Sequence, residues 1–231
     1  MPAAQAAVRW NCWKGGFAMS ELRLLFEKRG TARYISHLDL MQVFRRAFAR
    51  ADVPIGFTQG FHPHPNLNIL LPLPTGFESV CELLDFALDA PRLPDQFLYR
   101  INRALPAGIC VTSVGEARTP AKFIRYAAYE MNADIPIEAE RIAELFSREE
   151  LVVTKRTKRG ESETNILPLL RDLNVQTRDG GVTIRAKVAA GNENLNPEYI
   201  LAAIEKYCGA GPAYASYLRR EVYDAELRVF R

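Results

Sequence analysis

Imidazole groups are concentrated in one short part of this sequence. The chain has three histidines, His37, His62 and His64, and its other 228 positions contain none. His62 and His64 each stand directly before a proline in QGFHPHPNLNI, and a proline biases the residue before it toward extended geometry. In a β-like stretch the two rings would point the same way and could meet one ligand, whereas in a polyproline helix they would splay apart.

Four interpretations of these imidazoles are open. Two of them could act as a general acid and base, or all three with Asp39 could hold zinc. They could contact RNA, or the segment Gln59–Pro65 could be a rigid turn whose rings bond to the backbone. We expect no metal site. The candidates for catalysis are His37, His62 and His64.

Two groups of basic side chains suit contacts with phosphates, which position a nucleic acid without reading its sequence. Arg45, Arg46 and Arg50 recur along a predicted helix. The segment KRTKR enters a predicted hairpin loop at Gly160, and its cations repel one another without a counter-charge. For the helix arginines a solvated helix face is the favoured interpretation, whereas for KRTKR a solvated hairpin tip and a phosphate contact are equally open. The predicted substrate-binding or RNA-binding residues are His37, Asp39, Arg45, Arg46, Gln59, His62, His64, Lys155, Arg156, Lys158 and Arg159.

Composition narrows the class of protein. The 231 residues are 48% hydrophobic and 25% charged, which supports a folded core. The net charge of +3 permits a nucleic-acid partner without demanding one. The four cysteines contain no C-x-x-C pair, which disfavours a disulfide framework, a zinc ribbon and a cysteine-bound iron–sulfur cluster.

We expect a cytoplasmic protein with no membrane association. No stretch approaches the roughly 20 apolar residues that cross a bilayer. Residues 1–19 have no continuous apolar region of the signal-peptide kind, and Met19 precedes the first patterned segment. We therefore interpret residues 1–19 as a disordered leader or a misassigned start.

Hydrophobic periodicity in the first half predicts the order strand, helix, strand, strand, helix, strand. Ser36 is the predicted N-cap of the first helix, with Asp39 completing a box-like start. This is the order of the ferredoxin-like split β-α-β fold, whose second strand lies at a sheet edge, where Pro72 is tolerated. The other five elements are the strands 21–30, 66–74, 82–90 and 109–117 and the helix 94–108.

The same order recurs in the second half, with the added segment 165–181, which could be a short helix before a turn. The predicted fold is therefore α+β, with tandem ferredoxin-like domains and antiparallel sheets. We place the N-terminal domain at 20–115, a linker at 116–122 and the C-terminal domain at 123–231. The second set of elements is the strands 123–131, 151–158, 181–190 and 220–230 and the helices 135–150 and 196–209.

The sheet surface itself is a poor candidate for RNA. Ferredoxin-like sheets that bind single strands stack bases on aromatic residues of the two central strands. Here the first strand offers Arg23, Leu25 and Glu27 on its other face, and the third has no row of aromatics. We expect any nucleic acid to contact loops or a cleft between the domains.

Four short motifs carry a resemblance to a known family. They are Ser36-His37-Leu38-Asp39, Gly60 to Pro65, Leu71-Pro72-Leu73-Pro74 and Gly76-Phe77-Glu78-Ser79. With these, the chain from about residue 20 onward resembles the uncharacterised bacterial family of radical-SAM-linked proteins. At the level of fold alone it also resembles tandem ferredoxin-like CRISPR-repeat-processing endoribonucleases.

The family resemblance implies a partnership. Members are encoded beside, or fused to, a radical-SAM protein. This chain lacks the C-x-x-x-C-x-x-C signature, so no cofactor is expected on it, and the iron–sulfur cluster and SAM would belong to the partner.

Three hypotheses about function follow. The first is a non-catalytic module that presents a structured RNA, such as tRNA or rRNA, to the radical-SAM protein. The second is a metal-independent endoribonuclease with histidine acid–base chemistry. The third is a protein-interaction scaffold that docks through the edge strand or the arginine helix. The first depends on the histidine loop and the start of the first helix sharing one pocket.

Overall fold

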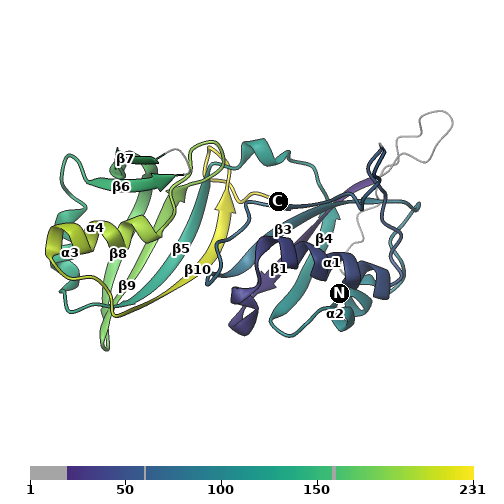
Figure 1. The fold of residues 1–231 in the computed structure, drawn as a ribbon, viewed down its shortest axis with the longest axis horizontal. Coiled ribbons are helices and arrows are strands. Elements are labelled where there is room, and N and C mark those ends of the chain that lie inside the picture. Colours follow the sequence, from purple (N-terminus) through teal and green to yellow (C-terminus); the bar gives the residue numbers. More distant parts are fainter. Residues whose placement is uncertain (1–19, 60, 158–159) are drawn as a thin grey trace, which may run out of the picture.

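The computed structural model describes residues 20–59, 61–157 and 160–231 (Figure 1). The predicted leader and two of the predicted RNA-contacting residues, Lys158 and Arg159, lie outside these ranges. For Arg156 only the backbone position is described.

The first repeat has the predicted element order. Its central strands are β1 and β3, with β4 beyond β1 and β2 pairing with β3 on the opposite side. The alternation in β1 buries Leu22, Leu24 and Phe26 against α1, where the rings of Phe26 and Phe44 meet edge-on at 4.7 Å. The elements are β1 (Ser20–Lys28), α1 (His37–Arg50), β2 (Leu67–Leu70), β3 (Glu78–Leu88), α2 (Phe97–Ala104) and β4 (Ile109–Glu116).

The second repeat has the same topology, with strand order β10-β5-β9-β8. The predicted α+β fold of tandem ferredoxin-like units is therefore confirmed. Asn196 Oδ1 accepts a hydrogen bond from the backbone N–H of Glu198, the first residue of α4, and Gly209 ends that helix in the left-handed region at φ 82°. The elements are β5 (Tyr126–Asp134), α3 (Ala139–Leu145), β8 (Leu170–Arg178), β9 (Gly181–Ala189), α4 (Glu198–Cys208) and β10 (Tyr214–Tyr223).

One strand assignment in the second repeat is wrong. The predicted strand 151–158 contains β6 (Val152–Thr157), which pairs with β7 (Gly160–Asn165) in a separate two-stranded hairpin. The true second strand is β8, in the segment predicted as an addition, where only Leu167–Leu169 forms a short 3-10 helix. β8 escaped detection because its register shifts between Arg171 and Asn174, which breaks the alternation on which a sequence prediction depends.

The last strand also begins earlier than predicted. β10 starts at Tyr214, and the chain beyond Tyr223 turns through residues 224–228 before Phe230 returns to the core. The backbone N–H of Phe230 donates to the carbonyl oxygen of Val222 at 2.8 Å. The apolar residues of the predicted strand 220–230 thus include a segment that turns back and packs on the core. The strand itself ends at Tyr223.

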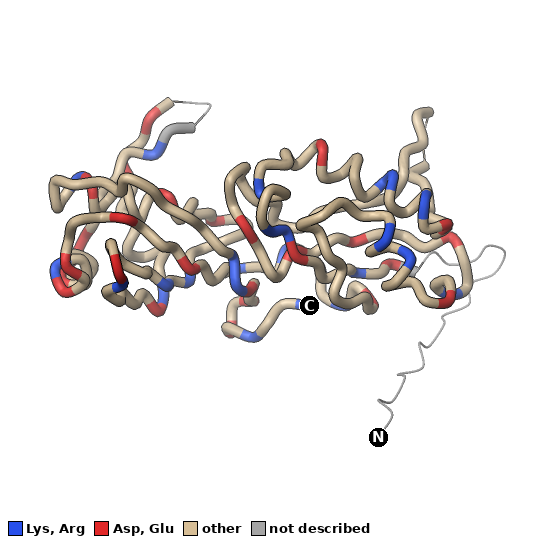
Figure 2. Tube along the Cα trace, turned by 90° about the horizontal axis from the view of Figure 1, so that it is seen from below, with Lys and Arg blue, Asp and Glu red and all other residues tan. Residues whose placement is uncertain are grey.

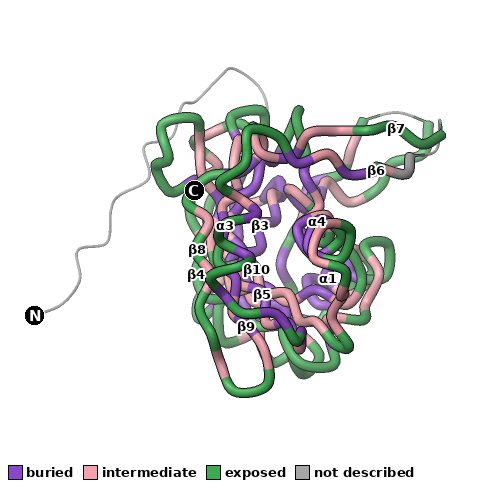
Figure 3. The backbone as a smooth tube through the Cα atoms, turned by 90° about the vertical axis from the view of Figure 1, so that its left-hand side faces the viewer, coloured by how far each residue is buried: buried purple, intermediate pink, exposed green. Residues whose placement is uncertain are grey.

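The two repeats share one eight-stranded sheet, a feature that the sequence analysis did not predict. β3 has 11 residues and β2 only 4, so the first residues of β3 have no partner on the β2 side. β10 fills that position in parallel, with Leu218 opposite Glu78 and Arg219 opposite Ser79. Figure 3 shows α1 and α4 on the same side of this sheet. The junction between the repeats is therefore a continuous sheet with helices along one face.

Candidate functional site: a pocket at the junction of the two repeats

A cavity of about 330 Å³ lies where the two repeats meet. The first repeat contributes His37 and the segment Leu71–Pro74. Strands of the second repeat contribute the floor, and the segment Asn194–Pro197, just before α4, contributes the opposite wall. The floor residues are Ala127, Tyr129, Val188, Ala190 and Arg219.

The cap of α1 places His37 at this cavity. Ser36 Oγ accepts a hydrogen bond from the backbone N–H of Asp39 at 3.2 Å, and its hydroxyl donates to Asp39 Oδ2 at 2.7 Å. The predicted N-cap is therefore confirmed. His37 is the first residue of the helix, and its ring is exposed. Asp39 closes the cap, so its carboxylate is already engaged by Ser36.

The segment Leu71–Pro74 forms the wall opposite the second repeat. β2 ends at Leu70 because Leu71 takes the left-handed conformation, with φ 48°. The carbonyl oxygen of Leu71 accepts a hydrogen bond from Arg219 Nη1 at 2.7 Å. The two prolines that follow are exposed, whereas Leu73 is buried. A residue of the last strand thus fixes the wall that precedes β3.

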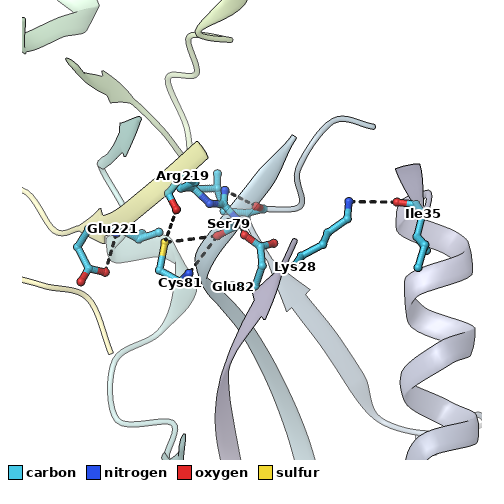
Figure 4. A network of polar contacts seen from close by, with 9 residues as sticks. Lys28, Ile35, Ser79, Cys81, Glu82, Arg219 and Glu221 are labelled. Atoms are coloured by element: carbon cyan, nitrogen blue, oxygen red, sulfur yellow. Dashed lines mark hydrogen bonds and ion pairs between the residues drawn. The ribbon is translucent and has the colours of Figure 1, made fainter. Parts of the chain in front are cut away.

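Arg219 belongs to a buried charged network beneath the cavity (Figure 4). Arg219 and Glu82 are each 1% exposed, and Arg219 Nη2 donates to the carboxylate of Glu82. Burial disfavours the charge of Arg219, but Glu82 keeps the pKa of the guanidinium above its ordinary value. Lys28 is buried beside them and donates to the carbonyl oxygen of Ile35 at 3.1 Å. Burial lowers the pKa of Lys28, and the charge of Glu82 opposes that change.

Cys81 lies in the same network as a free thiol. Its Sγ lies 3.6 Å from Ser79 Oγ and 3.8 Å from the carbonyl oxygen of Arg219. Burial raises the pKa of this thiol to about 11. Because the thiolate is the reactive form, Cys81 is a packing residue at neutral pH.

Lys155 brings the inserted hairpin to the rim of the cavity. Its Nζ donates to the carbonyl oxygen of Asn194 at 3.2 Å and lies 5.8 Å from the ring centre of Tyr199. Burial lowers the pKa of Lys155. Of the predicted KRTKR cations, this is the one whose side chain the structure describes, and it contacts a cavity-lining residue.

His62, His64 and Gln59 lie elsewhere, in the loop that follows α1. That loop is tied to the far end of β3, where Ile55 bridges to Leu88. The start of α1 lies near the first residues of β3, because Lys28 is opposite Ser79 and also contacts Ile35. Nine residue steps of β3 separate the two ends, which corresponds to roughly 30 Å. The expectation that the three imidazoles share one pocket is wrong, because α1 itself keeps them apart.

The loop has the hydrogen bonds of a braced turn. The backbone N–H of Thr58 donates to the carbonyl oxygen of His64 at 2.9 Å, and Thr58 Oγ1 lies 3.0 Å from His64 Nδ1. Phe57 and Pro65 form a β-bridge across the loop. The structural-turn interpretation therefore fits His64. At the tip, the side chain of Phe61 is fully exposed, with a relative exposure of 102%.

The helix arginines lie between these two places. Arg46 and Arg50 are exposed and Arg45 is half-buried. None of the three has a carboxylate partner in the part of the chain that the structure describes. Basic and acidic residues are otherwise interspersed over both repeats (Figure 2), so α1 is a local strip of unpaired positive charge.

Two kinds of feature, a group of metal ligands and a membrane-spanning helix, are absent from the residues that the structure describes. Within them, no three His, Cys, Asp or Glu side chains are grouped so as to hold a metal ion. The helices of residues 20–59, 61–157 and 160–231 include none with the length and apolar character needed to span a membrane.

Three of the four sequence motifs converge on the junction. His37 of the motif Ser36–Asp39 and the whole segment Leu71–Pro74 line the cavity, and Gly76–Ser79 lies beside it, with Ser79 opposite Arg219 in the sheet. Sequence reasoning missed Arg219, its pairing with Glu82 and the wall at Asn194. The charged pair occupies strand positions that look solvent-facing, and its two members are 137 positions apart.

Comparisons with solved structures give only weak similarity. A protein titled "Crystal Structure of an Unknown Protein from Galdieria sulphuraria" is 12% identical, covering 87% of this chain and 98% of that one, at a TM-score of 0.25. A putative glycine cleavage system transcriptional repressor is 8% identical, with the same coverages and TM-score.

No curated protein matches the sequence. A family model does match, over residues 21–197. That range covers most of the chain, including the three motifs at the junction and the loop of His62 and His64. The chain therefore belongs to the family described as "Uncharacterized protein conserved in bacteria (DUF2344)".

Proposed function

We propose that this chain is a non-catalytic accessory module of a radical-SAM enzyme and that it binds a structured RNA at the junction of its two repeats. The pocket expected from the sequence, with all three imidazoles together, is replaced in this proposal by the junction cavity, which His37 lines and His62 and His64 do not. One observation carries the proposal: His37 and Leu71–Pro74 of the first repeat meet Asn194–Pro197 of the second around one cavity. A tRNA or rRNA in the cytoplasm is the substrate class. The iron–sulfur cluster and SAM would be held by the partner.

The surroundings of the cavity suit a nucleic-acid backbone. Lys155 lies at the rim of the cavity. α1 begins at the cavity with His37, and Arg45, Arg46 and Arg50 follow farther along this helix. α1 has 14 residues and is about 21 Å long. An RNA strand that runs from the junction along α1 would therefore place several of its phosphates beside this helix. Such contacts position an RNA, while sequence or structure is read elsewhere.

The ribonuclease alternative has less support. Histidine acid–base cleavage needs a second imidazole or a lysine within reach of the first. His62 and His64 lie at the other end of α1 from His37, so the pair would have to come from the exposed loop alone. Incubation of the pure chain with total RNA should leave the RNA intact.

The exposed loop favours a second role, docking to the partner protein. Phe61 is a fully exposed aromatic side chain on a hydrogen-bonded turn. Buried aromatic anchors dominate the energy of many protein interfaces, and Phe61 together with Phe57, which is 55% exposed on the same braced loop, is suited to that use. This loop replaces the edge strand and the arginine helix as the docking candidate.

Co-purification tests the proposal. The full chain and the radical-SAM protein encoded beside it would be expressed together and crosslinked, and the bound RNA would be sequenced. We expect one RNA class to be enriched and its binding to weaken steeply with salt, because phosphate contacts release counterions. Absence of enriched RNA, or weak binding with no salt dependence, would contradict the proposal. A complex that resists nuclease and high salt would identify the scaffold function instead.

A further inference from the structure

We infer that the junction cavity receives a single unstacked base of the RNA and that the phosphates stay outside it. This inference rests on the proposed RNA-binding function and names the part of the RNA that is recognised.

The size and the apolar lining of the cavity suit a base. Its floor includes Ala127 and Val188, which lie opposite each other on β5 and β9, together with Ala190. These three side chains are apolar and buried, so this part of the floor offers no polar group. Pro72 and Pro74 form an apolar wall at one side. A volume of about 330 Å³ is near the lower end of the range for small-ligand pockets, roughly 300–1,000 Å³.

The charges of the cavity favour a neutral ligand. Arg219, the buried cation in the floor, is matched by Glu82, and its two Nη atoms already donate to Glu82 and to the carbonyl oxygen of Leu71. A phosphate placed here would have to compete with Glu82 and the Leu71 carbonyl for the one cation that lines the cavity within the described residues, and burying it would be costly.

The two helix starts at the cavity are also occupied. Asp39 stands in the first turn of α1 and Glu198 in that of α4, and each adds a negative charge there. Ser36 Oγ accepts the backbone N–H of Asp39, and Asn196 Oδ1 accepts that of Glu198 at 3.2 Å. These helix ends therefore offer little to an anion, in contrast to open helix N-termini.

Two free polar side chains are placed to read the edge of a base. His37 and Asn194 both line the cavity and are exposed, and neither side chain has a hydrogen bond within the described residues. An asparagine amide offers a donor and an acceptor, which match the Watson–Crick or Hoogsteen edge of an unstacked base. Lys155 contacts the backbone of Asn194, so a phosphate attached to that base would lie beside a cation.

The experiment uses the full chain and stem-loop RNAs in which one loop nucleotide is 2-aminopurine or is abasic. The test variant is His37→Ala/Asn194→Ala. The matched control is His62→Ala/Asn192→Ala, which removes the same residue types from the far loop and from a neighbouring position outside the cavity. A third variant, Val188→Phe, fills the floor, and thermal unfolding checks that each variant is folded.

We expect 2-aminopurine fluorescence to rise on binding and the abasic RNA to bind about tenfold more weakly than the intact one. The test variant should lose that tenfold preference, while the control keeps it. Equal affinity for intact and abasic RNA would overturn base insertion and leave RNA binding standing. No binding of any RNA would overturn the proposed function itself.

The source of the base is tested separately with adenosine, guanosine, cytidine and uridine. A free nucleoside could bind as tightly as the stem-loop and compete with it. That result would contradict the inference that the occupant of the cavity is a base of an RNA. Binding of free nucleosides far weaker than that of RNA supports the inference, because the phosphate contacts outside the cavity are then required.

Discussion

Arg219 Nη1 donates a hydrogen bond of 2.7 Å to the carbonyl oxygen of Leu71, from the last strand of the second repeat to the segment after β2 in the first. Leu71 is held there in the left-handed region, at φ 48°, which costs a non-glycine residue of order 1–3 kcal/mol. The same guanidinium is paired with Glu82. Arg219 thus both joins the repeats and shapes the wall of the proposed RNA site.

Replacing Arg219 alone should destabilise the protein strongly. Arg219→Met leaves the carboxylate of Glu82 buried without a partner, and breaking a buried ion pair in this way typically costs about 3–5 kcal/mol. Urea unfolding followed by circular dichroism measures the loss. The double variant Arg219→Met/Glu82→Leu should recover most of it, because no buried carboxylate is then left without its guanidinium partner. A single variant that loses less than about 1 kcal/mol would contradict this role for the pair.

Lys155 should contribute to RNA affinity through charge. Lys155→Gln should weaken binding of the co-purified RNA and reduce the slope of log affinity against log salt by about 1. Fluorescence anisotropy between about 50 and 200 mM salt measures both quantities. Arg141→Gln, an exposed residue of α3, is the control for loss of one positive charge. Equal effects of the two variants would mean that Lys155 has no local role.

The Cys81 thiol should make stability fall in alkaline solution. Its pKa rises from an ordinary 9.0 to about 11 in the folded protein, so between these values the unfolded chain releases the proton while the folded chain keeps it. Stability from this group is complete below pH 9 and lost as pH rises toward 11, and the loss at pH 10 is about 1.4 kcal/mol. Urea midpoints at about pH 8 and pH 10 measure it. Cys81→Ala should show a smaller drop, and an unchanged drop would contradict this assignment.

Phe61 should matter for partner binding and little for stability. Because its side chain is fully exposed, Phe61→Ser should leave the unfolding midpoint unchanged while reducing co-purification of the proposed radical-SAM partner at least tenfold, about 1.4 kcal/mol of binding. Phe123→Ser removes another exposed phenylalanine, 48% accessible, and serves as the control. Full retention of the partner by Phe61→Ser would remove the loop as a docking surface.

The local features of the first repeat could be predicted from its sequence. Ser36 at the helix start and the alternation of Leu22, Leu24 and Phe26 depend on neighbours close along the chain. Such short-range signals placed His37 at the start of α1 correctly. They could not show that the loop with His62 and His64 lies near the opposite end of that helix. The distance between this loop and His37 is set by the length of α1 and by how α1 packs on β3.

The junction could not be predicted because it is built from distant pairs. Leu71 and Arg219 are 148 positions apart. The parallel pairing of β3 with β10 does not involve a connecting turn, so no turn signal in the sequence predicts it. The position of β8 was obscured by Asp172, whose φ of 49° lies within the register shift. A single sequence therefore indicated two ferredoxin-like units and left open how they combine into one sheet.

Crosslinking of the RNA complex, with mass spectrometry of the crosslinked peptides, tests the central claim most directly. The full chain would be irradiated with the RNA that co-purifies with it and its partner. We predict crosslinks to peptides containing His37, Leu71–Pro74 or Asn194–Pro197, the residues that line the junction cavity. Crosslinks confined to other surfaces, with none to these three segments, would contradict the assignment of the cavity as the RNA site.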